Sequence, residues 1–159
     1  MALFSLKDFF SAMAPGRRVI GIDPGARRIG IALSDVNRQV ASPYSTIVRA
    51  RLKHNAAEIR AIADEEGAAG MVIGLPLGLD GDFGPAAQAV RDWAHALTAA
   101  TGLPAAMYDE SLSTATVQAA LIEADVSRAR RAALVDKLAA AQILQNALDA
   151  VNAASSLSG

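Results

Sequence analysis

Apolar residues along the chain fall into short continuous runs early on, and these runs later alternate with longer segments of helical spacing. The short runs have the length and apolar content of strands, and turn-forming pairs such as Pro24-Gly25 separate them. One run contains Pro43, which is poorly suited to the middle of a central strand. Strands are expected over residues 17–23, 28–34, 40–48, 70–75 and 103–108.

Segments between and after the later runs predict helices. In residues 51–66, Leu52, Ala56 and Ile59 recur every three or four positions, and Gly67 follows as a stop. Further helices are expected over residues 85–101, 114–123 and 128–152, the last with Ser127 as its N-cap.

The element order is typical of one mixed sheet with helices on both faces, because a hairpin-like start is followed by alternating strands and helices. A length of 159 residues fits one domain, expected over residues 17–152. Residues 1–16 carry an apolar helical stripe and form an N-terminal extension, expected to be a short helix, and residues 153–159 are expected to form a frayed tail.

The composition limits where the protein is expected to act and which metal ions it is expected to bind. No apolar run reaches the ~20 residues that span a bilayer, and the N-terminus lacks the basic region of a signal peptide, so a cytoplasmic protein without membrane contact is expected. The chain has no cysteine, and its two histidines, His54 and His95, lie far apart. A bound metal is therefore expected to be a hard cation such as Mg²⁺ or Mn²⁺, held by carboxylates.

Three separated acids are the candidate ligands. Asp23 ends the first strand, Glu110 follows the last strand, and Asp136 shares a helix face with Ala140 and Ile143. A carboxylate on a buried stripe is costly unless it is paired or binds metal, and acids at strand ends line the usual crevice of α/β sheets. Asp109 is an alternative ligand to Glu110.

Each acid also has a simpler structural explanation. Asp23 before Pro-Gly suits a turn, and Asp109 and Glu110 suit the cap of a following helix. Asp136 could pair with Arg131 or Lys137, or lie half exposed.

The basic residues near the acids are candidates for contacts to a polyanion, although runs of this kind are more often solvated faces. The net charge of −1 gives no support to a strongly basic nucleic-acid binder. The candidates for substrate binding are Arg27, Arg28, Arg128, Arg130 and Arg131.

The first hairpin also resembles the phosphate-binding hairpin of sugar kinases and actin-like ATPases. Gly25 and Gly30 would permit close backbone approach to a phosphate there, and the Gly-rich residues 74–84 offer a second such loop. That class needs a second, similar domain to close over the nucleotide, and 159 residues are too few for it.

Four segments in order carry a closer resemblance: GIDPGARRIGIALSD (21–35), VIGLPLGLDG (72–81), YDESLST (108–114) and VDKLAAAQILQNALD (135–149). Over residues 17–149 the chain resembles the YqgF-type (RuvX-type) proteins, described as pre-16S rRNA nucleases or Holliday-junction-resolvase-like proteins. The resemblance implies a ribonuclease-H-like fold, with a mixed five-stranded sheet flanked by helices. It also implies a bacterial cytoplasmic role in maturation of the 16S rRNA 5′ end.

The same resemblance places the acidic site on Asp23, the Asp109-Glu110 pair and Asp136. The sequence departs from the pattern of the family at two positions. Ser111 stands where an arginine is usual, and Gly78 stands where a polar residue usually follows GLPL.

These observations together predict a metal-dependent endonuclease. Asp23 is expected to bridge two divalent ions, with Glu110 and Asp136 completing the site. The alternatives are a resolvase acting on branched DNA, usually as a dimer that matches the two-fold junction, and a non-catalytic RNA-binding factor. The expected partner is nucleic acid, with pre-rRNA favoured over branched DNA, and the sequence leaves a monomer and a homodimer open.

Overall fold

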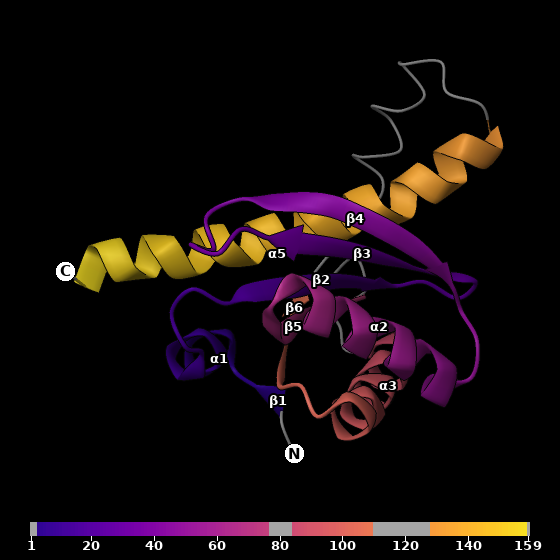
Figure 1. Cartoon of the computed structure of the whole chain (residues 1–159), viewed down its shortest axis with the longest axis horizontal. Coiled ribbons are helices and arrows are strands. Elements are labelled where there is room, and N and C mark those ends of the chain that lie inside the picture. The colour runs from indigo at the N-terminus through magenta and orange to yellow at the C-terminus, as the bar shows by residue number, and fades with distance from the viewer. Residues whose placement is uncertain (1–2, 77–83, 110–127, 159) are drawn as a thin grey trace.

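The computed structural model describes residues 3–76, 84–109 and 128–158. The chain forms one mixed sheet with helices on both faces (Figure 1). The first hairpin is β2 (Arg18–Pro24) and β3 (Arg28–Ser34). The other elements are β1 (Leu3–Phe4), α1 (Leu6–Ala12), β4 (Ala41–Val48), α2 (Leu52–Glu66), β5 (Ala68–Leu75), α3 (Pro85–Thr101), β6 (Ala105–Asp109) and α5 (Arg128–Ser158).

The strand order of the sheet is β1-β6-β5-β2-β3-β4. Strands β2, β5 and β6 are parallel, so their carboxyl ends meet at one edge of the sheet, whereas β3 runs antiparallel to β2 and β4. β4 is an edge strand, and an edge strand tolerates Pro43 because one side of its backbone needs no ladder partner. The pairing of β3 with β4 shifts register between Ile31 and Ala32, where Pro43 is paired.

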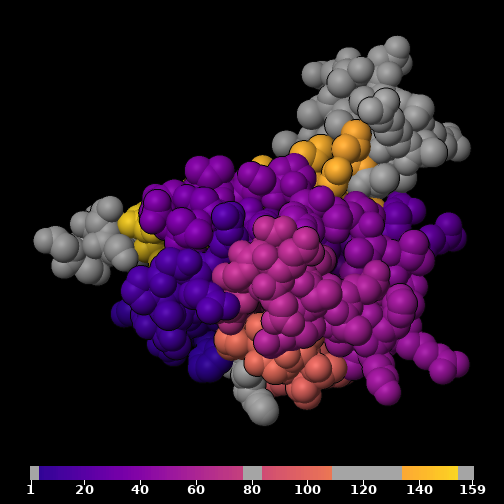
Figure 2. Space-filling model, viewed as in Figure 1, coloured from indigo at the N-terminus to yellow at the C-terminus, as the bar shows by residue number. Residues whose placement is uncertain are grey.

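Helices cover both faces of the sheet, as the continuous burial of β2, β3 and β5 requires. On one face, α2 and α3 pack on a core that includes Ile20, Ile22, Ile29 and Ile73. On the other face, α5 and α1 pack on a core formed around Ile143. Figure 2 is drawn from the side of α2 and α3, and only the orange and yellow ends of α5 emerge beyond the sheet.

Glycines in the strands let the second layer of helices approach the sheet closely. A Cβ atom on Gly21 would lie 2.7 Å from Leu144 Cβ of α5, and one on Gly30 would collide with the backbone carbonyl of Asp136. Near α1, a Cβ on Gly70 would lie 2.6 Å from the ring of Phe9. The backbone of α5 therefore rests directly on β2 and β3.

The expected five strands are all present, and β1 at the far edge adds a sixth. Two residues are too few to show the alternation from which a strand is predicted, so only pairing with β6 reveals it. The last helix was expected to end at residue 152, but α5 continues to Ser158. Ala153 and Ala154 favour helix, and residues 153–158 contain neither glycine nor proline. No local signal therefore ends the helix before Gly159.

Several expected features fall outside the described residues: the helix at 114–123, Ser127 as an N-cap, and most of the Gly-rich stretch at 74–84. None of the helices that the structure describes is long and apolar enough to cross a membrane.

Candidate active site

Asp23 and Asp136 come together where α5 crosses β2 and β3. Asp23 pairs with Gly30 across the hairpin, and residues directly opposite each other in an antiparallel pair project to the same face. The face at Gly30 is covered by the backbone of Asp136 itself. Asp23 also lies two positions after Gly21, which faces α5 as well. The fold thus brings together two acids that are 113 positions apart in sequence, from Asp23 to Asp136.

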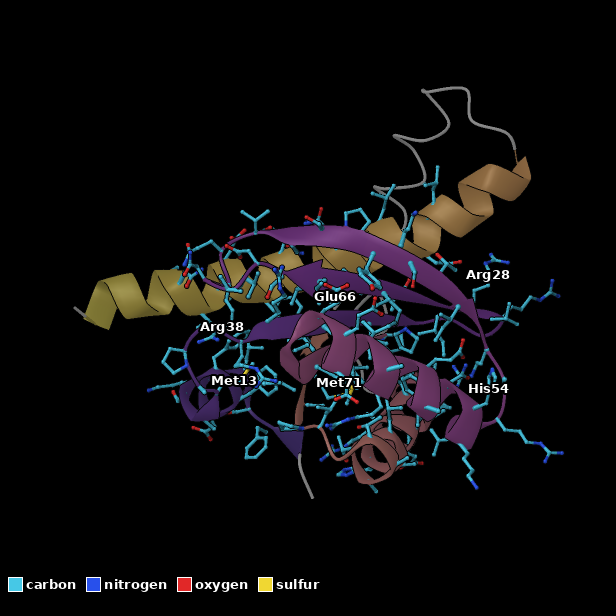
Figure 3. The ribbon with its side chains drawn as sticks, viewed as in Figure 1. Met13, Arg28, Arg38, His54, Glu66 and Met71 are labelled. Atoms are coloured by element: carbon cyan, nitrogen blue, oxygen red, sulfur yellow. The ribbon has the colours of Figure 1, made fainter. Side chains whose placement is uncertain are left out.

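An arginine neutralises one of these acids. Arg28 Nε donates a hydrogen bond to Asp136 Oδ2 at 2.5 Å, and the two side chains are 40% and 15% exposed. Arg28 precedes Gly30 by two residues, so it projects to the same face as the two acids (Figure 3 labels Arg28). A carboxylate this buried needs such a partner or a metal, and Arg28 is the partner of Asp136 that the structure describes.

The third predicted acid, Glu110, follows the end of β6 in the sequence. β6 ends at Asp109, whose backbone pairs with Leu75 of β5, at the same edge of the sheet as the end of β2. Glu110 and the side chain of Asp109 lie outside the described residues. Among the side chains that the structure does describe, no three acids or histidines form a group that could hold a metal ion.

The donors that are in place suit a hard divalent cation. Asp23 and Asp136 offer carboxylate oxygens, the ligands that Mg²⁺ and Mn²⁺ prefer, and no cysteine exists in the chain. His54 is surface-exposed and its Nε2 lies 3.5 Å from Glu58 Oε1, so it is a surface residue of α2. The pair of acids fits a carboxylate metal site that needs at least one more ligand.

The turn after Asp23 is tied to the end of β4 and to α3. The Gly25 amide donates to the Asp23 carbonyl at 3.0 Å, and the Arg49 amide donates to the Arg27 carbonyl at 2.9 Å. Arg49 Nη1 also donates to the Gly25 carbonyl at 2.9 Å, and its guanidinium lies 5.0 Å from the ring centroid of Trp93. A guanidinium over an indole is a favourable cation–π contact, so Arg49 fixes the turn that follows Asp23.

The kinase-like interpretation of this turn does not fit the packing. Gly30 is covered by the α5 backbone, so its missing Cβ makes room for a helix rather than for a phosphate. At Gly25 a Cβ would collide with the Arg28 carbonyl, which shows that this glycine serves the tight turn.

The remaining predicted substrate residues have different surroundings. Arg27 is exposed at the tip of the first hairpin. Arg128, Arg130 and Arg131 lie at the start of α5, before Asp136, and their side chains are outside the described set. Arg49 was not among the predicted site residues, because its contacts to Gly25 and Arg27 leave no local pattern in the sequence.

Two groups with shifted pKa values lie away from this site. The amide of Val40 chiefly, with that of Gln39, donates to Asp35 Oδ1 in the β3–β4 loop and lowers the pKa of Asp35. The Tyr44 hydroxyl donates to Glu66 Oε2 at 2.9 Å, which raises the pKa of Tyr44. Both groups stabilise the scaffold rather than the pair of acids.

The sequence is similar to proteins of a known family. Residues 17–150 match the RuvX family, which is described as Holliday junction resolvase. A protein of Acidiphilium cryptum named "Putative pre-16S rRNA nuclease" is 57% identical over 152 residues, covering 96% of each chain. A protein of the same name from Gluconacetobacter diazotrophicus is 54% identical, covering 94% of this chain and 98% of that one.

Among solved structures, RuvC of T. thermophilus in complex with a Holliday junction substrate is similar in fold. The TM-score is 0.52 at 16% identity, covering 84% of this chain and 94% of RuvC. This likeness confirms the expected ribonuclease-H-like fold.

Proposed function

The chain belongs to the RuvX family, and from this premise we propose that it is a metal-dependent endonuclease that hydrolyses phosphodiester bonds in 16S rRNA 5′-end maturation. The observation that carries the proposal is the meeting of Asp23 and Asp136 against Gly30 at the end of β2. Two carboxylates at this position would be the minimum of a site that binds divalent cations and faces a phosphodiester.

Asp23 and Asp136 are proposed as ligands of Mg²⁺ or Mn²⁺, with Glu110 or Asp109 as the third. When bound, a pair of such ions ~4 Å apart supplies activation of the attacking water and stabilisation of the leaving 3′ oxygen. Asp23 would be the central ligand of such a site, because it lies on the central strand β2, between β5 and β3. No histidine or cysteine nucleophile is needed.

Arg28 has two roles in this proposal. In the metal-free protein it neutralises Asp136 and so limits repulsion between the acids. Its planar N–H donors also suit phosphate oxygens, so Arg28 would be placed to contact the substrate if Asp136 held a metal ion.

Pre-16S rRNA is the favoured substrate because the relatives at 57% and 54% identity carry that name. The second candidate is branched DNA, favoured by the description of the family and by the junction in the RuvC complex. The proposed site of action is the bacterial cytoplasm, and a monomer is sufficient for RNA cleavage, whereas a junction with two-fold symmetry calls for a homodimer.

A cleavage assay tests the proposal. A 5′-extended rRNA fragment and a four-way DNA junction are each incubated with the protein and Mg²⁺, Mn²⁺ or EDTA. We expect cleavage of the RNA with either metal and none with EDTA or in the Asp23→Asn variant. The control is Asp92→Asn, an exposed acid on α3 whose loss should leave cleavage unchanged.

Cleavage of the junction alone would favour the resolvase. Tight RNA binding without cleavage in any metal would favour the non-catalytic binding factor and overturn the nuclease proposal.

A further inference from the structure

A basic segment lies at the junction of β4 and α2. Between Asp35 and Glu58 the chain has no acidic residue, and cations are concentrated at the end of this stretch. Arg51, Lys53 and His54 are exposed, while Arg49 is half-buried. We call these four residues together with Arg27 the basic rim. A local surface of this kind matters because the whole chain has a net charge of only −1.

The basic rim is joined to the candidate active site by hydrogen bonds. Arg49 holds the Gly25 and Arg27 carbonyls, and Gly25 follows Asp23 by two residues. Arg28, the partner of Asp136, is the next residue after Arg27. Figure 3 shows Arg28 and His54 at the same end of the molecule, opposite the end that carries Arg38 and Met13. The rim is therefore continuous with the edge of the acidic site.

Two exposed cations of the rim, Arg51 and Lys53, have charges that no acidic side chain of the described residues neutralises. Arg51 and Lys53 form no ion pair within the part of the chain that the structure describes. By contrast, Arg60 on the same helix pairs with Asp64 at 3.0 Å. The charges of Arg51 and Lys53 are thus available to a partner.

These charges also act against the stability of α2. Arg51 is the N-cap without a side-chain cap bond, Lys53 lies in the first turn, and that turn has no acidic residue. The amino end of a helix carries a partial positive charge, so cations there are unfavourable. Residues that locally disfavour the folded structure tend to occur where a function requires them.

We infer that the basic rim binds the sugar–phosphate backbone of the nucleic-acid strand adjacent to the phosphodiester held at Asp23 and Asp136. This inference rests on the proposed function, because the rim is useful only beside a site that cuts that strand. Side chains of this type contact phosphate oxygens rather than base edges, so they set the position of the strand without reading its sequence. Arg51 and Lys53 are positioning residues, and neither touches the reacting atoms.

Lys53 has a matched control in the chain. Lys53 and Lys7 are each the second residue of a helix, both are exposed, and replacing either with alanine changes the net charge equally. Lys7 belongs to α1, whose C-cap Met13 lies at the end of the molecule opposite Arg28 and His54 (Figure 3). The variants are Lys53→Ala, Arg51→Ala/Lys53→Ala and Lys7→Ala.

Binding of a fluorescein-labelled single-stranded RNA is followed by anisotropy over a series of NaCl concentrations in EDTA, which prevents cleavage. For Lys53→Ala the slope of log K against log salt should become shallower by about 0.7, and for the double variant by about 1.4, since each lost phosphate contact removes that amount. Lys7→Ala should bind with the slope of the wild type. In thermal unfolding, Lys53→Ala should be at least as stable as the wild type because a charge that opposes the helix dipole is gone.

If Lys53→Ala and the double variant bind RNA with the affinity and slope of Lys7→Ala, the rim is not the strand path and the inference is wrong. This failure is distinct from failure of the proposed function. Wild-type protein that cleaves RNA with Mn²⁺ while all variants bind alike would refute only the rim. Salt slopes that depend on Lys53 in a protein that never cleaves would refute only the nuclease.

Discussion

Arg28, the first residue of β3, and Asp136, on the inner side of α5, form an ion pair between segments 108 residues apart. The contact closes α5 over Gly30, where the helix backbone touches the sheet. It also accounts for the presence of an acid on a buried helix face, because Asp136 has a cationic partner even without metal.

Replacing Arg28 with alanine should destabilise the metal-free protein by about 1 kcal/mol, because the largely buried Asp136 carboxylate loses its partner. The loss is no larger because solvent already screens the more exposed guanidinium of Arg28. The same change should tighten Mn²⁺ binding in a calorimetric titration because the cation that competes for Asp136 is removed. Arg27→Ala, at the exposed neighbour, should alter neither quantity. Weaker Mn²⁺ binding in Arg28→Ala would show instead that Arg28 organises the site.

Asp23→Asn should abolish cleavage while leaving the metal-free protein as stable as the wild type, or more stable. Removing one of two adjacent negative charges relieves repulsion and desolvation in the folded state. Urea unfolding measures this. A sharp drop in the unfolding midpoint with an unchanged m value would identify Asp23 as a structural residue of the hairpin.

Gly30→Ala should destabilise the fold by about 3 kcal/mol, because the added methyl group would collide with the Asp136 carbonyl and push α5 off the sheet. Mn²⁺ affinity should fall too, since Asp136 moves with the helix. Gly84→Ala is the matched control: its Cβ would meet nothing within 4 Å, and the change should cost no more than a weakened N-cap, below about 1 kcal/mol. Equal stability of the two variants would contradict the close contact.

The stability contributed by Asp35 should depend on pH in a defined direction. The Val40 amide chiefly, with that of Gln39, lowers the pKa of Asp35 in the folded protein below its ordinary value of 3.8. The wild type should therefore exceed Asp35→Ala in stability by a constant amount above about pH 4. That difference should shrink as the pH falls through the folded pKa, where the carboxylate gains a proton. Unfolding midpoints of both proteins across this range measure the effect, and a difference that grows on acidification would contradict it.

Replacing Arg130 and Arg131 with alanine should flatten the salt dependence of RNA binding and weaken binding across sequences, because two phosphate contacts are lost. Both residues precede Asp136 on α5 by less than two helical turns. Mn²⁺ binding should change little. Unchanged affinity and slope would identify these arginines as a solvated helix face and leave the basic rim as the strand path.

The sequence by itself determined the elements and the topology class. Runs such as GMVIGL (70–75) are apolar at every position because β5 is buried between two layers of helices, and Gly67 and Gly102 end helices by adopting positive φ. These are local or periodic signals, so they can be read from neighbouring residues. The same holds for Asp23, whose place at the end of a strand before Pro-Gly is visible in the sequence.

Only the tertiary structure decided which groups meet. The sequence did not indicate Arg28 as a partner for Asp136, and β3 brings it there. It offered Gly30 as room for a phosphate, whereas α5 fills that space. It did not identify Arg49 at all, because a cation that binds the carbonyls of a turn more than twenty residues away leaves no local pattern. Such pairings depend on the register of the strands and on where a helix crosses them. Several distant segments of the chain set both together, so no single segment predicts them.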